Sequence, residues 1–179
     1  MGVFKPMLPF EATTLIERAI ANAEQGCDEV IVVSGYRGDE LSDHLMHNKR
    51  HEPRPQLRIV RNERWERGML SSIQCGAREV AGDYFFIAPA DMPYLTPEIY
   101  AALLAEAPQY AAFPERGGRR GHPVLISAAV IPQLLNADVE TLGSMRRFLT
   151  GYPTETRTVE TDAIFIDLDT IEQYRRAVR

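Results

Sequence analysis

Strand-like and helix-like segments alternate along the chain, and this alternation restricts the folds that it can adopt. A stretch with apolar residues at helical spacing, Thr13–Glu24, ends before Gly26 and is followed by the β-branched run Glu29–Gly35. Two further runs, Leu57–Val60 and Tyr84–Pro89, each follow another helix-like stretch. Runs rich in β-branched and aromatic residues are typical of parallel strands buried on both faces. The pattern predicts right-handed βαβ units in a three-layer α/β/α sandwich with a mostly parallel, Rossmann-like sheet.

Weaker patterns complete the expected secondary structure. The remaining helices are predicted at Asp39–Asn48, Ser71–Val80, Thr96–Ala107, Ala128–Leu135, Leu142–Leu149 and Thr170–Val178. The remaining strands are predicted at Tyr110–Phe113, Pro123–Ile126, Thr156–Val159 and Ile164–Ile166. Thr96 is expected to cap the helix that begins with Pro97, because threonine accepts hydrogen bonds at helix starts and proline is tolerated there.

Size and composition indicate one globular domain, residues 1–179, in the cytoplasm. A chain of 179 residues with 45% apolar residues is long enough for one sizeable core. The formal charge of −5 argues against general binding to nucleic acid or to an anionic membrane. No membrane-spanning run and no signal peptide are visible. The two cysteines, Cys27 and Cys75, fit a reducing cytosol better than a disulfide framework.

The aspartate at the end of the Tyr84–Pro89 run is the strongest lead to the chemistry. Asp91 lies in the segment Pro89–Pro93, directly after this predicted strand. Ligands of open α/β sheets bind outside the carboxyl ends of the strands, so a carboxylate here faces the place where a ligand binds. The alternative is a turn aspartate that caps the helix beginning near Thr96.

A second acidic cluster, Asp167–Asp169, follows the strand predicted at Ala163–Ile166. Carboxylates from two strand ends suit Mg²⁺, which takes oxygen ligands and keeps substrate phosphates in its coordination shell. Asp169 can equally cap the final helix, where Asp-Thr-Ile-Glu resembles a capping arrangement. We therefore predict Asp91 and Asp167 as the metal ligands, while the sequence does not show whether the two strand ends are adjacent.

The segment Asn62–Ser72, which joins a strand to a helix, contains the next candidate site. Gly68 permits a close approach of the backbone to a ligand, and Ser71 or Ser72 opens the helix with hydroxyl and N–H donors. Such donors can bind a base edge, a ribose or a phosphate. The alternative is a serine that caps the helix after an ordinary surface loop.

The segment Arg116–Pro123 contains three glycines and three arginines. It is either a mobile flap that clamps a phosphate through guanidinium groups or a solvated hairpin tip. His122 invites a catalytic interpretation, but no serine or cysteine has a nucleophile-elbow context. Histidine and cysteine also lack zinc-site spacing, so hydrolases and zinc enzymes are disfavoured.

Four short motifs in order carry a family resemblance: Gly68–Ile73, Ala90–Leu95, Arg120–Leu125 and Asp167–Thr170. Together they resemble the MobA-like nucleotidyltransferases, which attach a nucleotide to molybdopterin. The Gly-Met-Leu-Ser-Ser and Gly-His-Pro-Val elements are more similar to the cytidylyltransferase (MocA-like) branch than to the guanylyltransferase branch. The resemblance covers nearly the whole chain and implies the nucleotide-diphospho-sugar transferase type of fold.

The resemblance also implies a reaction and a set of roles. An NTP, with CTP favoured over GTP, would react with molybdopterin to give a dinucleotide-type product and pyrophosphate. Mg²⁺ would be held by Asp91 and Asp167, and Lys5 would act with Asp91 in catalysis by neutralising phosphate charge. The implied substrate contacts are Lys5, Asn62, Gly68, Ser71 and Ser72 for the nucleotide, and Arg120 and His122 for the acceptor.

Two other classes stay open. One is a non-catalytic protein that binds a nucleotide or pterin and passes it to a recipient molybdoenzyme. The other is a sugar- or alditol-phosphate nucleotidyltransferase, because the fold does not determine the acceptor.

The N-terminal segment departs from the family pattern. Family members open with a strand and a glycine-rich loop of the type Leu-Ala-Ala-Gly, whereas Met1–Phe10 matches only the end of that signature. The loop supplies backbone N–H groups for a triphosphate. The strand is normally interior, so its neighbours are expected to keep unpaired backbone groups, at about 1–3 kcal/mol for each buried one. We expect a truncated gene model, a degenerate inactive homologue, or a partner segment in the gap.

Overall fold

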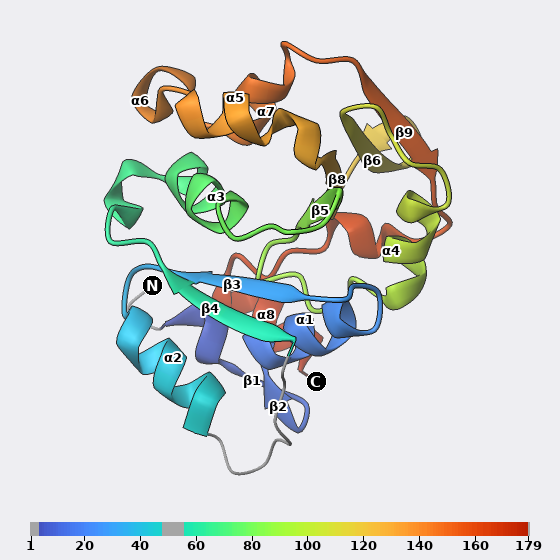
Figure 1. Ribbon diagram of the computed structural model, residues 1–179. Coiled ribbons are helices and arrows are strands. Elements are labelled where there is room, and N and C mark those ends of the chain that lie inside the picture. Colours follow the sequence, from blue (N-terminus) through green and yellow to red (C-terminus); the bar gives the residue numbers. More distant parts are fainter. Residues whose placement is uncertain (1–3, 48–55, 179) are drawn as a thin grey trace.

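The strands of the computed structural model, which describes residues 4–47 and 56–178, form separate sheets (Figure 1). A small parallel sheet pairs β3 (Val30–Ser34) with β4 (Leu57–Arg61). The larger sheet has the order β5–β8–β6–β7, with β9 beside β6. Its strands are β5 (Tyr84–Ile87), β6 (Ala111–Arg116), β7 (Arg119–Arg120), β8 (Val124–Ser127) and β9 (Thr154–Thr158). β8 is antiparallel to β5 and β6, and β9 is parallel to β6, so β5, β6 and β9 share one direction.

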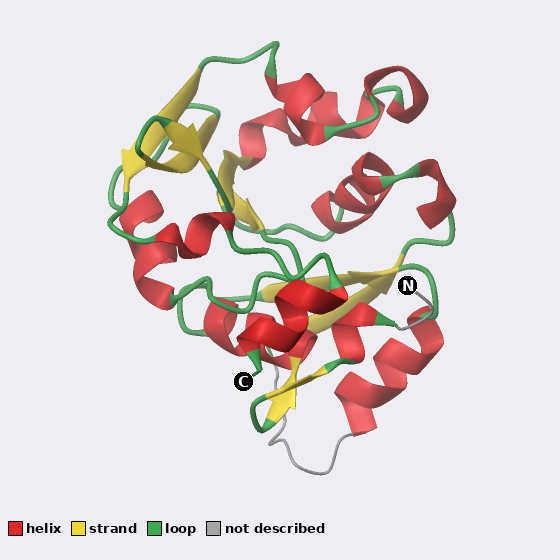
Figure 2. Cartoon of the chain, turned by 180° about the vertical axis from the view of Figure 1, so that it is seen from behind, coloured by secondary structure: helices red, strands yellow, loops and turns green. Residues whose placement is uncertain are grey.

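Helices cover the sheets on both faces (Figures 1 and 2). The α-helices are α1 (Leu15–Glu24), α2 (Gly38–His47), α3 (Met69–Ala77), α4 (Pro97–Leu104), α5 (Ile131–Asn136), α6 (Val139–Leu142), α7 (Met145–Leu149) and α8 (Ile171–Ala177). The short 3₁₀ helices are η1 (Lys5–Met7), η2 (Trp65–Arg67), η3 (Ala128–Val130) and η4 (Asp162–Phe165). A hairpin of β1 (Pro9–Phe10) and β2 (Thr13–Thr14) precedes α1.

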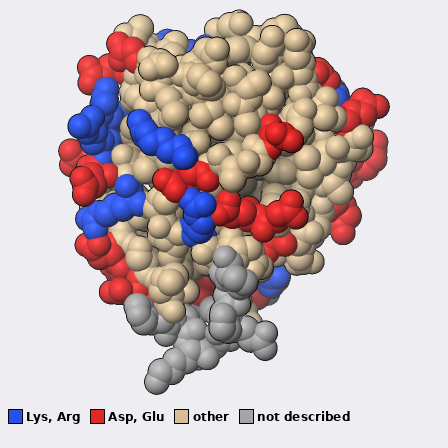
Figure 3. Space-filling model, in the orientation of Figure 1, with Lys and Arg blue, Asp and Glu red and all other residues tan. Residues whose placement is uncertain are grey.

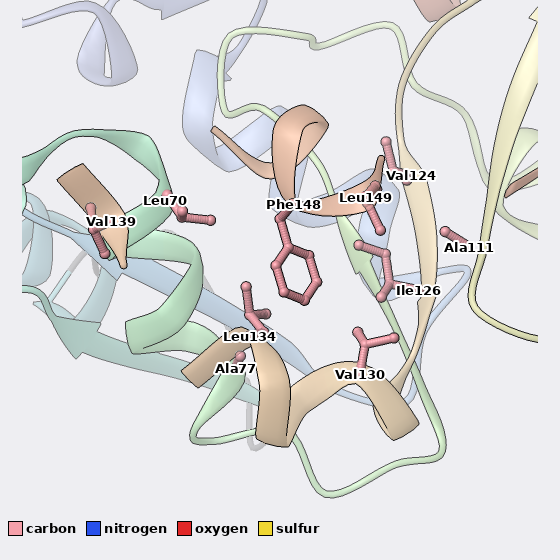
Figure 4. Close-up of a cluster of buried hydrophobic side chains, with 10 residues drawn as sticks. All are labelled: Leu70, Ala77, Ala111, Val124, Ile126, Val130, Leu134, Val139, Phe148 and Leu149. Atoms are coloured by element: carbon pink, nitrogen blue, oxygen red, sulfur yellow. The ribbon is translucent and has the colours of Figure 1, made fainter. Parts of the chain in front are cut away.

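Alternate residues of β8 face opposite layers of the molecule. Val124 and Ile126 pack with Leu70 of α3 and with α5–α7 in the cluster drawn in Figure 4. Leu125 packs with Leu103 of α4 on the other face. This period of two is what a strand buried on both faces requires. Around the smaller sheet, α1 and α2 cover one face and α3 the other. The predicted three-layer α/β/α sandwich is therefore confirmed.

Side-chain packing, and not strand pairing, joins the two sheets. Within residues 4–47 and 56–178, β3 pairs only with β4 and β5 pairs only with β8. Helix α3 packs on β3 and also contributes Leu70 to the cluster against the larger sheet. On the other face, Asn22 of α1 donates a hydrogen bond to the Pro93 carbonyl, at 2.9 Å. Tyr100 of α4 lies against Gly26, where an added Cβ would be 2.8 Å from the tyrosine Cβ.

Helix starts follow the local sequence with one exception. Thr14 and Glu17 form a reciprocal capping box, so α1 begins at Leu15 and not at Thr13. Thr96 occupies the predicted N-cap position of α4 and Pro97 follows it, but the predicted side-chain cap is wrong because Thr96 makes no such hydrogen bond. Its hydroxyl instead lowers the pKa of the nearby Glu98 carboxyl group.

The strand predicted at Ala163–Ile166 is wrong, because this segment is the 3₁₀ helix η4. The Thr161 side chain accepts a hydrogen bond from the Ala163 N–H and starts the turn. Ala163 and Ile164 are both buried in the cluster around Tyr100. Consecutive residues of a strand point to opposite faces, so a turn is needed to bury two neighbours on the same side.

The two cysteines differ in their surroundings, and we expect them to react at different rates. Burial, together with the nearby Asp28 carboxylate, raises the pKa of the Cys27 thiol to about 11. Burial also raises the pKa of Cys75, while Arg78 opposes this effect. Since the thiolate is the reactive form, iodoacetamide at pH 8 should label Cys75 well before Cys27, and raising the pH should speed both. Peptide mass mapping over time measures this, and faster labelling of Cys27 would contradict the structure.

The surface in Figure 3 carries acidic and basic side chains next to one another, with a mainly uncharged area over α5 and α7. None of the described helices is long and apolar enough to cross a membrane.

Candidate active site

Two segments that are far apart in the sequence meet beyond the end of β5. Asp91 lies in the turn after this strand, and its carbonyl accepts a hydrogen bond from the Leu168 N–H, at 3.0 Å. Leu168 is buried against Phe10, which holds the backbone of this segment in place. Asp167 and Asp169 flank Leu168, so three carboxylates come from two adjacent stretches of backbone. The structure therefore brings together the two predicted metal ligands.

Lys5 supplies positive charge to this acidic cluster, which we define as Asp91, Asp167 and Asp169. Its Nζ lies 2.8 Å from Oδ1 of Asp169. Burial raises the pKa of Asp91, and the Asp169 and Asp167 carboxylates raise it as well, while its backbone hydrogen bond and Lys5 lower it. Crowded carboxylates disfavour ionisation, so a bound cation would stabilise the charged form of Asp91.

The donors of the acidic cluster are carboxylate oxygens, which suit a hard divalent cation such as Mg²⁺. Across the described residues, no group of three or more His, Cys, Asp and Glu is arranged to hold a metal ion by itself. A cation at the cluster would have to complete its coordination shell with water or substrate phosphates.

His122 lies beside the same carboxylates. Its main-chain N–H donates a hydrogen bond to the Ile164 carbonyl, at 3.0 Å. Burial lowers the pKa of His122, while the Ile87 backbone and the Asp91 and Asp167 carboxylates raise it in part. In the described part of the chain, its buried Nδ1 has no hydrogen-bond partner. The imidazole is therefore packed inside the protein next to the acidic cluster, with part of its hydrogen-bonding capacity unused among the described groups.

Gly121 allows His122 to lie against η4, and we expect Gly121→Ala to disturb both. A Cβ at this position would be 2.4 Å from the Ile164 carbonyl oxygen and 2.7 Å from its Cβ. The two backbone segments must then separate, at an expected cost of roughly 1–3 kcal/mol. Urea denaturation measures the change, with Gly82→Ala as the control because its new Cβ would be 3.5 Å from the nearest atom. Equal stability of the two variants would contradict this view of Gly121.

The arginine-rich segment is a β-hairpin, and its tip is docked on η4. The Arg116 Nε lies 3.2 Å from Oδ1 of Asp162. The Arg119 guanidinium lies 4.4 Å from the ring centroid of Phe165. The structure thus shows a hairpin, as one alternative had it, but two of its arginines contact η4, which no sequence pattern indicated.

The Arg120 side chain contacts the larger sheet, whereas His122 lies beside the acidic cluster. Its guanidinium lies 5.0 Å from the Phe113 ring centroid and donates a hydrogen bond to Oγ1 of Thr154, at 3.0 Å. Both partners belong to the larger sheet. The structure brings His122 to the acidic cluster but gives Arg120 no contact with it among the described residues.

The loop between β4 and α3 is held together by its own side chains. The buried Asn62 donates hydrogen bonds to the hydroxyls of Ser71, at 2.8 Å, and Ser72, at 3.0 Å. The Ser71 hydroxyl donates in turn to the carbonyls of Gly68 and Arg64, at 2.8 Å and 3.1 Å. Asn62 and Ser71 therefore shape the loop and point inward.

Gly68 leaves the backbone of this loop open to a ligand. Its φ of +92° is unfavourable for other residues, and an added Cβ would meet no atom within 4 Å. Gly68 is also the N-cap of α3 and makes no side-chain cap. The backbone next to this helix start is therefore open, and the close approach of a ligand stays a prediction.

Asp169 lies in the acidic cluster, although the sequence favoured Asp167 over it as the metal partner. Thr170, and not Asp169, caps α8 through a capping box with Gln173. This leaves the Asp169 carboxylate free to pair with Lys5. Helix α8 lies beside the β1–β2 hairpin (Figure 2), and the Tyr174 hydroxyl donates to the Pro9 carbonyl at 2.6 Å. The local sequence signal for Thr170, and not Asp169, as the cap of α8 was the Thr-x-x-Gln capping pattern.

Known proteins resemble this chain in both sequence and fold. The sequence pattern of the MobA-like NTP transferase domain matches residues 1–158. The chain is 30% identical over 174 residues to molybdenum cofactor cytidylyltransferase of Escherichia coli, covering 97% of this chain and 86% of that protein. It is 31% identical over 105 residues to a probable molybdenum cofactor guanylyltransferase of Methanosarcina acetivorans, covering 59% of this chain and 46% of that protein.

Two solved structures have the same fold. A nucleotidyl transferase from Methanothermobacter superposes with a TM-score of 0.78 at 22% identity, covering 98% of this chain and 84% of that one. The Rv0371c protein of Mycobacterium tuberculosis in complex with manganese superposes with a TM-score of 0.76 at 18% identity, covering 99% of this chain and 92% of that one.

Proposed function

The chain belongs to the MobA-like NTP transferase family, and we propose that it transfers CMP from CTP to molybdopterin in a Mg²⁺-dependent reaction that releases pyrophosphate. That it is a nucleotidyltransferase of molybdenum cofactor biosynthesis follows from the family and its relatives. Similarity to the Escherichia coli cytidylyltransferase along 97% of the chain favours CTP over GTP. The observation that carries the proposal is the meeting of Asp91, Asp167 and Lys5 beyond the end of β5.

The proposed reaction asks the protein mainly to position charged groups. A phosphate oxygen of molybdopterin attacks the α-phosphorus of the NTP, a new P–O bond forms, and the bond to the β-phosphate oxygen breaks. Asp91 and Asp167 would hold Mg²⁺, which when bound would neutralise negative charge on the phosphates. Lys5 would add positive charge beside them. A manganese complex of a protein with the same fold is in keeping with a divalent cation.

The two substrates would approach from different sides of the acidic cluster. The open backbone at Gly68, with Ser72, would contact the nucleotide, and Asn62 and Ser71 would hold that loop in shape. His122, which lies beside the Asp91 and Asp167 carboxylates, would be on the acceptor side. We propose that Arg120 acts on the acceptor only by stabilising the hairpin, because its described contacts lie on the larger sheet.

A pyrophosphate-release assay tests the proposed function. The 179-residue protein is incubated with CTP or GTP, molybdopterin and Mg²⁺. We expect release with CTP to exceed that with GTP and to stop when EDTA removes the metal. No release with either nucleotide would contradict the proposal. Release with a sugar phosphate in place of molybdopterin would instead support the alternative acceptor.

A non-catalytic binding protein is the second candidate. It is favoured because β3 and β5 keep unpaired edges within the described chain, so no described strand between them presents a loop for the triphosphate. It predicts that CTP or the pterin binds without release of pyrophosphate. Equilibrium dialysis with labelled CTP, run beside the assay, distinguishes the two functions.

A further inference from the structure

Two exposed aromatic side chains meet beyond the carboxyl ends of β3 and β4. Tyr36 is 61% exposed and Trp65 is 39% exposed. Their ring centroids are 5.5 Å apart, with an interplanar angle of 59°. Large aromatic side chains usually lie in the core, so an exposed neighbouring pair is a candidate for contact with a ligand.

Neighbouring residues contact both aromatic side chains. An added Cβ at Gly35 would be 2.5 Å from the Trp65 Cβ, so the absence of a side chain there lets Trp65 lie against the backbone after β3. Phe4 contacts Tyr36 edge-on, with centroids 6.3 Å apart. The Arg37 guanidinium lies 5.0 Å from the Phe4 centroid and is itself paired with Glu40. The pair is thus held in place before any ligand arrives.

The position of the pair connects it to the candidate active site. The Trp65 carbonyl accepts a hydrogen bond from the Gly68 N–H, at 3.0 Å, so Trp65 belongs to the same loop as the open backbone. Phe4, which supports Tyr36, directly precedes Lys5, whose ammonium group contacts Asp169. The aromatic pair therefore lies between the proposed nucleotide loop and the proposed phosphate-binding lysine.

We propose that the Tyr36–Trp65 pair stacks on the base of the NTP. The assignment rests on the proposed function, because it takes the loop at Gly68 as the nucleotide side of the site. Every base has a flat π face, so stacking adds affinity for any base and leaves the choice of base to other groups. Loss of the Trp65 ring should therefore weaken the binding of CTP and GTP by about 10- to 100-fold and to similar extents.

Trp65 is the only tryptophan of the chain, so intrinsic fluorescence reports on this position alone. CTP and GTP should quench the emission in a saturable manner, whereas inorganic tripolyphosphate, which has no base, should not. Free N-acetyltryptophanamide corrects for absorption by the nucleotides. Equal quenching by tripolyphosphate would overturn the stacking assignment. Quenching by a free pterin but not by CTP would also overturn it, because the ring bound here would then be that of the acceptor.

Variants test the contribution of each ring to affinity, measured by equilibrium dialysis with labelled CTP. Trp65→Phe should bind CTP within about threefold of the native protein, whereas Trp65→Leu and Tyr36→Leu should bind at least about tenfold more weakly. Leu104→Ala is the control, since Leu104 is an exposed apolar residue on α4. Circular dichroism shows whether each variant folds. Unchanged affinity in both folded leucine variants would refute the proposal.

Failure of the stacking assignment is distinct from failure of the proposed function. Pyrophosphate release by the native protein, together with normal CTP affinity in both Trp65→Leu and Tyr36→Leu, refutes only the aromatic pair. Base-dependent quenching without any pyrophosphate release refutes only the transferase reaction.

Discussion

Asp91→Asn should lower kcat/KM for pyrophosphate release by about 10³-fold while leaving the protein folded. The substitution keeps the size of the side chain but removes one negative charge from the acidic cluster. The backbone carbonyl of residue 91 still accepts the hydrogen bond from Leu168, so the two segments stay together. A weaker cation site would also require a higher concentration of Mg²⁺ for half-maximal activity.

Asp83→Asn is a matched control for this variant. Asp83 is exposed and lies at the opposite end of β5, just before the strand begins. Its substitution should leave kcat/KM within about twofold, because a single exposed charge far from the site is screened by solvent. If Asp91→Asn kept more than a tenth of the native activity, the assignment of the metal-binding carboxylate would be wrong.

Leu70→Ala should destabilise the protein by about 2–5 kcal/mol, a large part of the roughly 5–15 kcal/mol that stabilises a typical domain. Leu70 is completely buried in the cluster that includes Phe148, Leu134 and Val124 (Figure 4). It belongs to α3, which packs on both sheets. A cavity here weakens packing where no strand pairing joins β3 to β5 within the described chain.

Met69→Ala is the control for Leu70→Ala, since Met69 is the preceding residue of the same helix and is 68% exposed. The free energy of unfolding of the Met69→Ala variant should differ from that of the native protein by less than about 0.5 kcal/mol. Urea denaturation monitored by circular dichroism measures both variants. If Leu70→Ala lowered the free energy of unfolding by less than about 1 kcal/mol, α3 would contribute little to joining the sheets.

Local patterns were sufficient where a segment interacts mainly with itself. The spacing of apolar residues predicted α1, and its capping box placed the start within two residues of the prediction. The apolar run before Asp91 predicted β5, and the glycine-rich segment was correctly considered as a hairpin. In these cases the backbone conformation depends on neighbours within about four residues, which the sequence displays directly.

Local patterns failed where a distant segment supplies the partner. Burial against Tyr100 and the hydrogen bond to His122 place residues 162–165 in a 3₁₀ helix, although their apolar character resembles a strand. The inward direction of Asn62 arises from the hydroxyls of α3, nine and ten residues later. The capping alternative for Asp169 is wrong because Thr170 caps α8, whereas the partner of Asp169, Lys5, comes from the other end of the chain.

The sequence by itself determined the α/β class, the order of the main elements, the family resemblance and the residue types of the site, because periodicity and motifs are properties of short segments. Only the tertiary structure decided which of those residues meet. It placed Asp167 and Asp169 beside Asp91, brought His122 to the same carboxylates, and turned Arg120 toward the sheet. It also set Tyr36 against Trp65, a contact between two loops that no local pattern contains. Such contacts depend on how whole layers pack, and packing is a property of the complete fold.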